Sequence, residues 1–282
     1  MSLESHLDQP LTYEALLPIR DLVAETCGLY FDEKKFYFIQ KRIGKRIKAT
    51  NTQTPRNYFR LLKLGGSSDE MEKLIASLTT NETYFYRYIP QLESFAEEAL
   101  PIVCSRKLEE NNRSLNIWSA GCSSGEEAYT IQILLREYLK DFARWDIQVH
   151  ATDIDQRMLE KGEKGIYEKR AVKDVPPPVL EKYFTEEDGK YHVIPELKEN
   201  LHFKNLNLMD RKAMRTCTDM DFVFCRNVLI YFDDKAKKQV VNSIYDSLLP
   251  GGFIFLGHSE SVGKISATFK LVKLQKSLSY QK

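Results

Sequence analysis

A turn of small residues follows a short apolar run in the middle of the chain and leads into two acidic residues. The run ends at Trp118, the turn is Gly121-Cys122-Ser123-Ser124-Gly125, and Glu126 and Glu127 come next. Glycines let the backbone turn tightly and approach a ligand closely, and carboxylates are favoured in the first turn of a helix. A strand, a tight turn and a helix N-terminus are typical of nucleotide-cofactor sites in α/β proteins.

The two acidic residues indicate which kind of cofactor such a turn would hold. The turn lacks the G-x-G-x-x-G spacing of dinucleotide sites, and two carboxylates would repel a pyrophosphate. A nucleoside cofactor with positive charge and no phosphate fits better, and S-adenosylmethionine has a sulfonium, an ammonium group and two ribose hydroxyls. The alternative is a loop that merely turns the chain, and this motif alone leaves both interpretations open.

A second strand, with Ile147, Val149 and Ala151 as its apolar residues, ends in Thr152-Asp153-Ile154-Asp155. An acidic residue at the carboxyl end of the second strand is placed to accept hydrogen bonds from ribose hydroxyls. Asp153 is the candidate for this role. A helix N-cap is the competing interpretation, and it suits Asp155 better than Asp153.

Composition excludes several classes of protein. The 41 basic and 40 acidic residues nearly cancel, so overall charge favours neither nucleic acid nor membrane surfaces. The chain starts without a signal-peptide pattern and has no run of about 20 apolar residues, so we expect a cytoplasmic protein without membrane insertion. The five cysteines form no C-x-x-C pair and the five histidines are scattered, which predicts neither a disulfide framework nor a metal site.

The order of predicted elements divides the chain into a helical part and an α/β part. We expect an all-helical domain over residues 1–80, a connecting segment over 81–95 where a cleft forms, and an α/β domain over 96–282. The α/β domain should carry a small β subdomain at about 180–203. In the connecting segment, Asn81, Thr83 and Arg87 offer polar groups to a ligand, although turn and cap chemistry would equally explain the first two.

A basic helix is predicted between Asp32 and Lys48, where seven basic residues stand against two acidic ones. Helical spacing places apolar and basic residues on different sides. The apolar side comprises Phe36, Ile39, Ile43 and Ile47, and the basic side comprises Lys34, Lys41, Lys45 and Lys48. Most charged helix faces are simply solvated, but the density of one sign favours a docking surface for an acidic partner.

Five motifs in this order resemble those of the CheR family of chemotaxis receptor methyltransferases. They are Thr80-Asn81-Glu82-Thr83-Tyr84-Phe85-Tyr86-Arg87, Gly121-Cys122-Ser123-Ser124-Gly125-Glu126-Glu127, Ala151-Thr152-Asp153-Ile154-Asp155, Phe224-Cys225-Arg226-Asn227-Val228-Leu229-Ile230-Tyr231-Phe232 and Leu256-Gly257-His258-Ser259-Glu260. The resemblance implies a class I S-adenosylmethionine-dependent methyltransferase fold, mostly parallel and Rossmann-like, with an all-helical N-terminal domain. It also implies a protein-glutamate O-methyltransferase that esterifies glutamates on the cytoplasmic helices of chemoreceptors during sensory adaptation, releasing S-adenosylhomocysteine.

The resemblance also assigns roles to matching residues. Those nearest the methyl transfer would be Arg87, Arg226 and Tyr231. The cofactor site would be lined by Asn81, Thr83, Arg87, Gly121, Glu126, Asp153, Asn207, Leu208, Arg226 and Asn227. The receptor would be docked by Lys34, Lys41, Arg42, Lys45, Arg46 and Lys48.

A substrate carboxylate is ionised at neutral pH, so it needs no strong general base, and catalysis is expected from in-line positioning. Some family members hold a receptor tail on a longer glycine-bearing loop. Here Gly189 is the only glycine between Glu181 and Leu208, so we expect an enzyme that needs no such tether. We also expect a monomer. Two alternatives are a methyltransferase that reaches nucleic acid through the basic helix, and a cofactor-binding regulatory module without turnover. No N-P-P-Y-like motif supports the former, and Arg226, Asn227 and Tyr231 argue against the latter.

Overall fold

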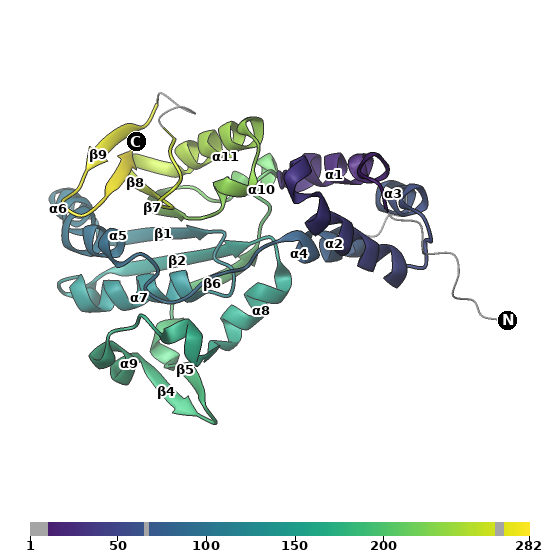
Figure 1. The fold of residues 1–282 in the computed structure, drawn as a ribbon. Helices are drawn as coiled ribbons and strands as arrows, with labels where there is room; N and C mark the ends of the chain where they lie inside the picture. Colours follow the sequence, from purple (N-terminus) through teal and green to yellow (C-terminus); the bar gives the residue numbers. More distant parts are fainter. Residues whose placement is uncertain (1–10, 65–67, 263–267) are drawn as a thin grey trace. The chain divides into compact units, whose positions relative to one another are not determined.

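The computed structural model describes residues 11–64, 68–262 and 268–282, and the chain forms two compact units. A helical unit contains residues 1–80 together with 231–236, and a larger unit contains 81–230 together with 237–282. Figure 1 shows helices in the first unit and a sheet with helices in the second. Within the described residues, no helix is both long and apolar enough to cross a bilayer.

Among its described residues, the helical unit has four amphipathic α-helices, α1 Tyr13–Cys27, α2 Phe36–Ala49, α3 Pro55–Leu64 and α4 Ser68–Leu78. Thr12 caps α1 by accepting the Ala15 N–H, and Gly28 ends it in a left-handed conformation at φ 78°. On α2, Ile39, Ile43 and Ile47 are each 1% exposed. The predicted apolar side of the basic helix is therefore confirmed, and its burial joins α2 to the rest of this unit.

Glu70 on α4 connects three of these helices through polar contacts. Its carboxylate accepts hydrogen bonds from Arg46 Nε at 2.9 Å and Arg46 Nη2 at 2.5 Å, and from the Tyr58 hydroxyl at 2.7 Å. Its side chain is only 9% exposed. The hydrogen bond to Glu70 raises the pKa of Arg46, and burial raises that of Tyr58. Arg46, predicted as a docking residue, thus serves the interior of the helical unit as well.

The larger unit is organised around a seven-stranded sheet in the order β6-β2-β1-β7-β8-β10-β9. Its parallel strands are β6 Leu201–Asn205, β2 Asp146–Asp153, β1 Ser114–Ala120, β7 Met220–Cys225 and β8 Leu248–Leu256. Two antiparallel strands, β9 Lys270–Lys273 and β10 Leu278–Gln281, complete it beside β8. These two strands form a hairpin, because the chain reverses between residues 273 and 278.

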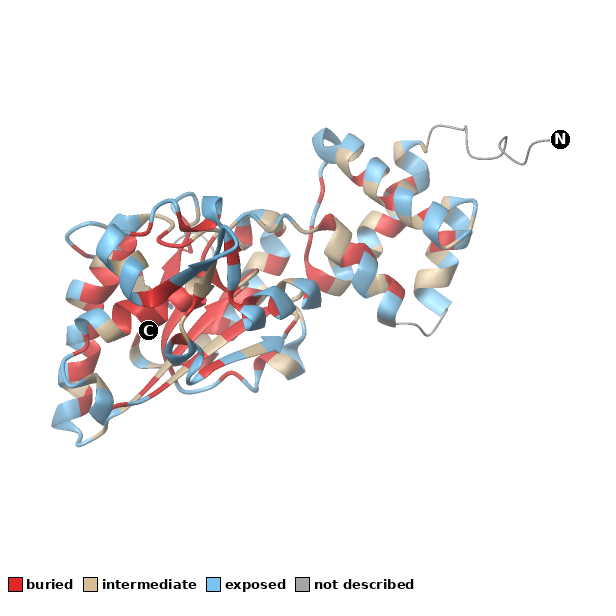
Figure 2. Cartoon of the chain, turned by 90° about the horizontal axis from the view of Figure 1, so that it is seen from below, coloured by how far each residue is buried: buried red, intermediate tan, exposed pale blue. Residues whose placement is uncertain are grey.

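Burial follows the sheet, as the red central strands in Figure 2 show. All six residues of β7 are buried, which explains the apolar run at residues 222–225 within that strand. Phe95 packs edge-on against Phe222 and Phe224 at centroid distances of 5.1 Å. The remaining helices of this unit are α5 Ile89–Ser94, α6 Leu100–Glu109, α7 Glu126–Tyr138, α8 Gln156–Lys164, α9 Pro177–Tyr183, α10 Arg211–Met214 and α11 Asp234–Ser247, the last beginning in residues grouped with the helical unit.

A small antiparallel sheet lies outside the main one, in the order β3-β5-β4. Its strands are β3 Ile166–Glu168, β4 Phe184–Glu187 and β5 Lys190–Val193. The structure thus places the β subdomain at 166–193 rather than at about 180–203. Three-residue β3 is too short to show alternation in the sequence, and residues 201–203 pair with β2 in the main sheet.

Replacing Glu70 with alanine should destabilise the helical unit, because Arg46 and the Tyr58 hydroxyl would lose a largely buried partner. We expect the free energy of unfolding to fall by about 2–4 kcal/mol. Both tryptophans, Trp118 and Trp145, lie in the larger unit. The urea concentration at the midpoint of unfolding should therefore fall more when unfolding is followed by far-ultraviolet circular dichroism than when it is followed by tryptophan fluorescence. Glu72→Ala, at an exposed position of α4, is the matched control, and equal transitions for the two variants would contradict this role.

Candidate active site

Parallel strands bring the predicted site residues to one edge of the sheet. From β1 the chain moves outward to β2 and β6 and then returns to β7 on the other side of β1. This reversal is a topological switch point, where α/β proteins bind ligands beyond the carboxyl ends of the strands. The Gly121–Gly125 turn follows β1, Asp153 ends β2, and Arg226 and Asn227 follow β7.

The turn after β1 is held against the end of β2 by backbone hydrogen bonds. The N–H groups of Gly121 and Cys122 both donate to the Thr152 carbonyl, at 2.8 and 2.9 Å. Gly121 has φ +83°, and a Cβ there would lie 2.4 Å from the Val228 side chain. Gly125, at φ +88°, then forms the N-cap of α7. The predicted strand, turn and helix are confirmed. The positive φ values, and at Gly121 the closeness of Val228, explain why these two positions are glycines.

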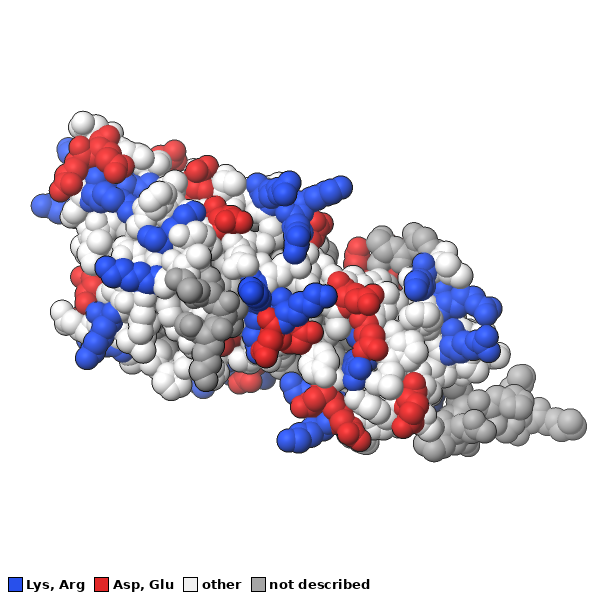
Figure 3. All heavy atoms as spheres, turned by 90° about the horizontal axis from the view of Figure 1, so that it is seen from above, with Lys and Arg blue, Asp and Glu red and all other residues white. Residues whose placement is uncertain are grey.

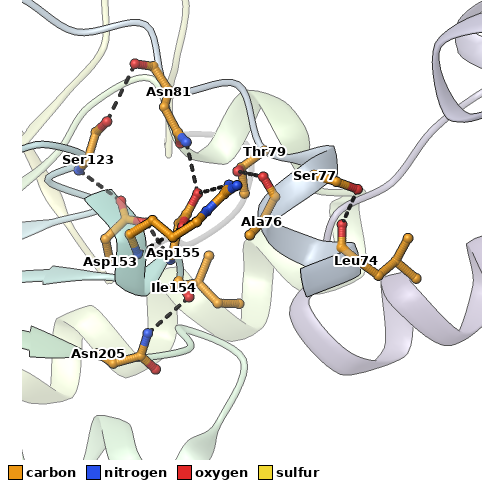
Figure 4. Close-up of polar contacts among 11 residues, drawn as sticks. Leu74, Ala76, Ser77, Thr79, Asn81, Ser123, Asp153, Ile154, Asp155 and Asn205 are labelled. Atoms are coloured by element: carbon orange, nitrogen blue, oxygen red, sulfur yellow. Dashed lines mark hydrogen bonds and ion pairs between the residues drawn. The ribbon is translucent and has the colours of Figure 1, made fainter. Parts of the chain in front are cut away.

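Asp153 is almost completely buried and accepts two backbone hydrogen bonds, as Figure 4 shows. Its Oδ2 accepts the Ser123 N–H at 2.8 Å, and its Oδ1 accepts the Asp155 N–H at 2.9 Å. Burial raises the pKa of this carboxyl, while the backbone donors act in the opposite direction. Each oxygen keeps a further lone pair, which is what acceptance of ribose hydroxyls would require.

Asp155 has the role that the alternative interpretation gave it. It caps α8, with its side chain accepting the Arg157 N–H at 3.1 Å. The same carboxylate accepts from Asn81 Nδ2 at 3.1 Å, and the Asn81 carbonyl accepts from Ser123 Oγ at 3.5 Å. Asn81 is thereby placed beside the β1 turn and the end of β2.

Three carboxylates surround the buried Cys122 side chain. Burial raises the pKa of this thiol, and the charges of Asp153, Glu127 and Glu126 raise it further. Glu126 is 4% exposed and accepts from Ser124 Oγ, and burial raises its pKa as well. A cationic ligand suits such a cluster, so the donor set fits S-adenosylmethionine.

Arg226 connects the strand ends with the segment that starts at Asn81. Its Nη1 donates to Glu127 Oε2 at 3.2 Å, and its Nη2 donates to the Arg87 carbonyl. Ser119 Oγ donates to the other Glu127 oxygen at 2.6 Å. Arg226 Nε is buried without a hydrogen-bond partner among the described residues, so this side chain keeps one donor available within the site.

The Arg87 side chain lies along its own segment. Its Nη1 donates to the Glu82 carbonyl at 2.7 Å, and its guanidinium lies 5.7 Å from the centroid of the Tyr84 ring. Tyr86 and Tyr88, on either side, have φ of 59° and 63°. Such left-handed conformations in bulky residues are strained and concentrate at functional sites. Strain here is therefore consistent with a segment shaped for a ligand.

The remaining predicted residues lie just after β6, between Asn81 and Arg87, and in the helical unit. Asn207 and Leu208 follow β6, and Asn207 Oδ1 accepts the Met209 N–H at 2.9 Å. Thr83 is half-buried between Asn81 and Arg87. Tyr231 belongs to the helical unit, where its carbonyl accepts the Tyr30 N–H at 2.8 Å, so its part in the reaction stays a prediction.

Sequence reasoning gave no individual role to Glu127 or Glu260. Glu127 pairs with Arg226, which is 99 residues away, and Glu260 accepts hydrogen bonds from residues about 30 positions earlier. Both residues stood inside the quoted motifs. The sequence marked Glu127 only as one of two acidic residues at a helix start, and Glu260 only through the motif resemblance, because helical or strand periodicity carries no information on such distant pairs.

Comparison with known proteins gives matches over both units. The CheR methyltransferase all-alpha domain matches residues 14–79, and the CheR methyltransferase SAM-binding domain matches residues 81–278. Chemotaxis protein methyltransferase 2 of Vibrio cholerae is 41% identical over 93% of this chain and 91% of its own length. The chemotaxis protein methyltransferase of Borreliella burgdorferi is 32% identical, over 91% of each chain. This chain therefore belongs to the CheR methyltransferase family and is an S-adenosylmethionine-dependent methyltransferase.

Proposed function

We propose that the protein transfers the methyl group of S-adenosylmethionine to glutamate side chains on the cytoplasmic helices of chemoreceptors, forming methyl esters. The observation that carries this proposal is the carboxylate cluster at the ends of β1 and β2, within a chain that matches CheR models over both units. Its relatives named above are chemotaxis methyltransferases. The proposal places the enzyme in the cytoplasm, as a monomer.

The protein groups would act by binding and orientation. Asp153 would accept the ribose hydroxyls, and Glu126 and Glu127 would face the cationic end of the cofactor. Arg226, held by Glu127, would keep its free Nε–H for the methionine carboxylate or the substrate glutamate. The cofactor supplies a methyl group activated by its positive sulfonium. Because a glutamate is already ionised, positioning is the main requirement.

The exposed lysines of the basic helix are the proposed docking surface for the acidic receptor. Lys41, Lys45 and Lys48 on α2 and Lys34 in the preceding 3-10 turn Glu33–Lys35 are exposed. Arg42 lies 5.2 Å from the Phe38 ring centroid. By contrast, Figure 3 shows basic and acidic side chains interspersed on the drawn face of the larger unit. Local charge on α2, rather than net charge, would select the partner.

Tether-independent binding is part of the same proposal. The hairpin of β4 and β5 turns in only two residues, Asp188 and Gly189, which have φ of 49° and 72°. This turn offers no extended loop for holding a receptor tail. The short turn supports direct recognition of receptor helices.

Incubation with methyl-labelled S-adenosylmethionine and receptor-containing membranes should label a receptor-sized band. Mild alkali should release the label as volatile methanol, because carboxyl methyl esters are base-labile. The matched control uses a receptor whose methylatable glutamates are replaced by alanine. Alkali-stable label, or label on added nucleic acid, would contradict the proposal.

Asp153→Asn should weaken cofactor binding, because an amide cannot accept hydrogen bonds at both positions where Asp153 now does. We expect the dissociation constant for S-adenosylmethionine to rise roughly 10-fold to 100-fold, corresponding to charged hydrogen bonds. Isothermal titration calorimetry measures this directly. Asp146→Asn, at the exposed opposite end of β2, should bind normally. Equal affinities would remove Asp153 from the cofactor site.

Reversing three charges on the docking surface, Lys34, Lys41 and Lys45 to glutamate, should raise KM for receptor membranes. Exposed charge pairs contribute modestly each, so a rise of roughly 10-fold is expected for three. Both kcat and cofactor affinity should stay unchanged, and added salt should reduce the difference. The control reverses Arg56, Lys63 and Lys73, exposed residues elsewhere in the helical unit. An equal effect of both triple variants would show only nonspecific attraction.

A further inference from the structure

Glu260 makes an unusual set of contacts just beyond the end of β8. Its Oε2 accepts the N–H of Asn227 at 2.8 Å and that of Gly257 at 2.6 Å, and its Oε1 accepts the N–H of Ile230 at 3.1 Å. Gly257 follows β8, whereas Asn227 and Ile230 follow β7, the neighbouring parallel strand. One side chain thus joins the two loops that leave adjacent strand ends.

The joined loop is the one that carries predicted site residues. Arg226 and Asn227 come directly after β7, and Tyr231 follows Ile230 in sequence. Asn227 has φ 60°, the left-handed region, where the chain leaves the strand sharply. Backbone N–H groups in such a turn need acceptors outside regular structure. A carboxylate that accepts from both ends of the turn fixes its path.

Gly257 provides the space that this contact needs. A Cβ at residue 257 would lie 2.6 Å from Glu260 Oε2 and 2.8 Å from the Asn227 nitrogen. Both distances are too short for real side-chain carbons, so any larger residue would push the carboxylate and the loop apart. Gly257 and Glu260, which are three residues apart, therefore act together to make this contact.

We propose that Glu260 is a positioning residue that fixes the backbone of residues 226–230 for methyl transfer. The inference rests on the proposed function for its catalytic consequence. Glu260 is not a catalytic residue, because its carboxylate is engaged by backbone donors. Its effect reaches the reaction through Arg226, Asn227 and the start of the segment leading to Tyr231.

Glu260→Ala should lower kcat for receptor methylation by about 10-fold to 100-fold, the scale of a misplaced reacting group. KM for the receptor should change little, because docking is proposed to lie on α2. Amide hydrogen exchange in residues 226–231 should speed up, while exchange in β1 and α7 stays as in the wild type. Glu109→Ala, at an exposed position of α6, is the control and should alter neither measurement.

A double-mutant cycle separates positioning from general stability. Gly257→Ala should also lower kcat, and the loss in the double variant with Glu260→Ala should be smaller than the sum of the two single losses, because both disrupt the contact between residues 257 and 260. If the alanine variant at 260 loses native circular dichroism, Glu260→Gln, which keeps size and one acceptor, takes its place in the cycle. Additive losses, or unchanged exchange in residues 226–231, would overturn the proposal. A wild-type enzyme without receptor methylation would refute the proposed function instead, and the exchange experiment would still decide the role of Glu260.

Discussion

Carboxylates gathered at the ends of neighbouring strands repel one another, and the candidate site is arranged around that repulsion. Glu126, Glu127 and Asp153 all act on the buried Cys122 thiol. Each is balanced differently: Glu127 by Arg226 and Ser119, Asp153 by backbone N–H groups, and Glu126 by Ser124. Arg226 pairs directly with Glu127, and the charges of Lys161 and Arg170 act on Glu126. A cationic cofactor is the natural complement to such a site.

The need to balance these carboxylates also explains why distant segments of the chain meet at Arg226. Its guanidinium reaches Glu127 at the start of α7 and the Arg87 carbonyl in the segment that follows the helical domain. Phe85, fully buried and packed edge-on against Tyr167 and Phe184, anchors that segment in the core of the larger unit. Charge balance and hydrophobic packing therefore hold the same stretch of chain from two sides.

Local signals were sufficient for the framework and for residues whose role depends on their own element. The apolar run of β7, the small-residue turn after β1 and the acidic end of β2 each follow from neighbouring residues, and all are present in the structure. The assignment of Asp155 as a helix cap also needed only its position before α8. The mostly parallel α/β fold with a helical N-terminal domain was predictable for this reason.

What remained hidden depends on contacts between distant residues. Helical spacing placed the four exposed lysines of the basic helix on one side, but it could not show that Arg46 meets Glu70 from another helix. Similarly, β3 joins the small sheet by pairing with β5, whose residues lie 22 to 26 positions later in the chain. A three-residue segment is too short for its apolar and polar alternation to indicate a strand.

Direct methyl transfer to a carboxylate also explains why the site needs neither a thiolate nucleophile nor an acid or base group. The five cysteines are buried, and burial raises the pKa of Cys122 and Cys225 well above the ordinary value, so neither thiol is an available thiolate nucleophile. Burial likewise raises the pKa of Tyr129 and Tyr167, keeping these phenols neutral. With an ionised substrate and an activated methyl donor, the protein has little acid or base chemistry to perform. The main contribution of the protein is then the geometry of the site. This explains why carboxylates that accept backbone N–H groups, such as those of Asp153 and Glu260, lie at or just beyond the strand ends.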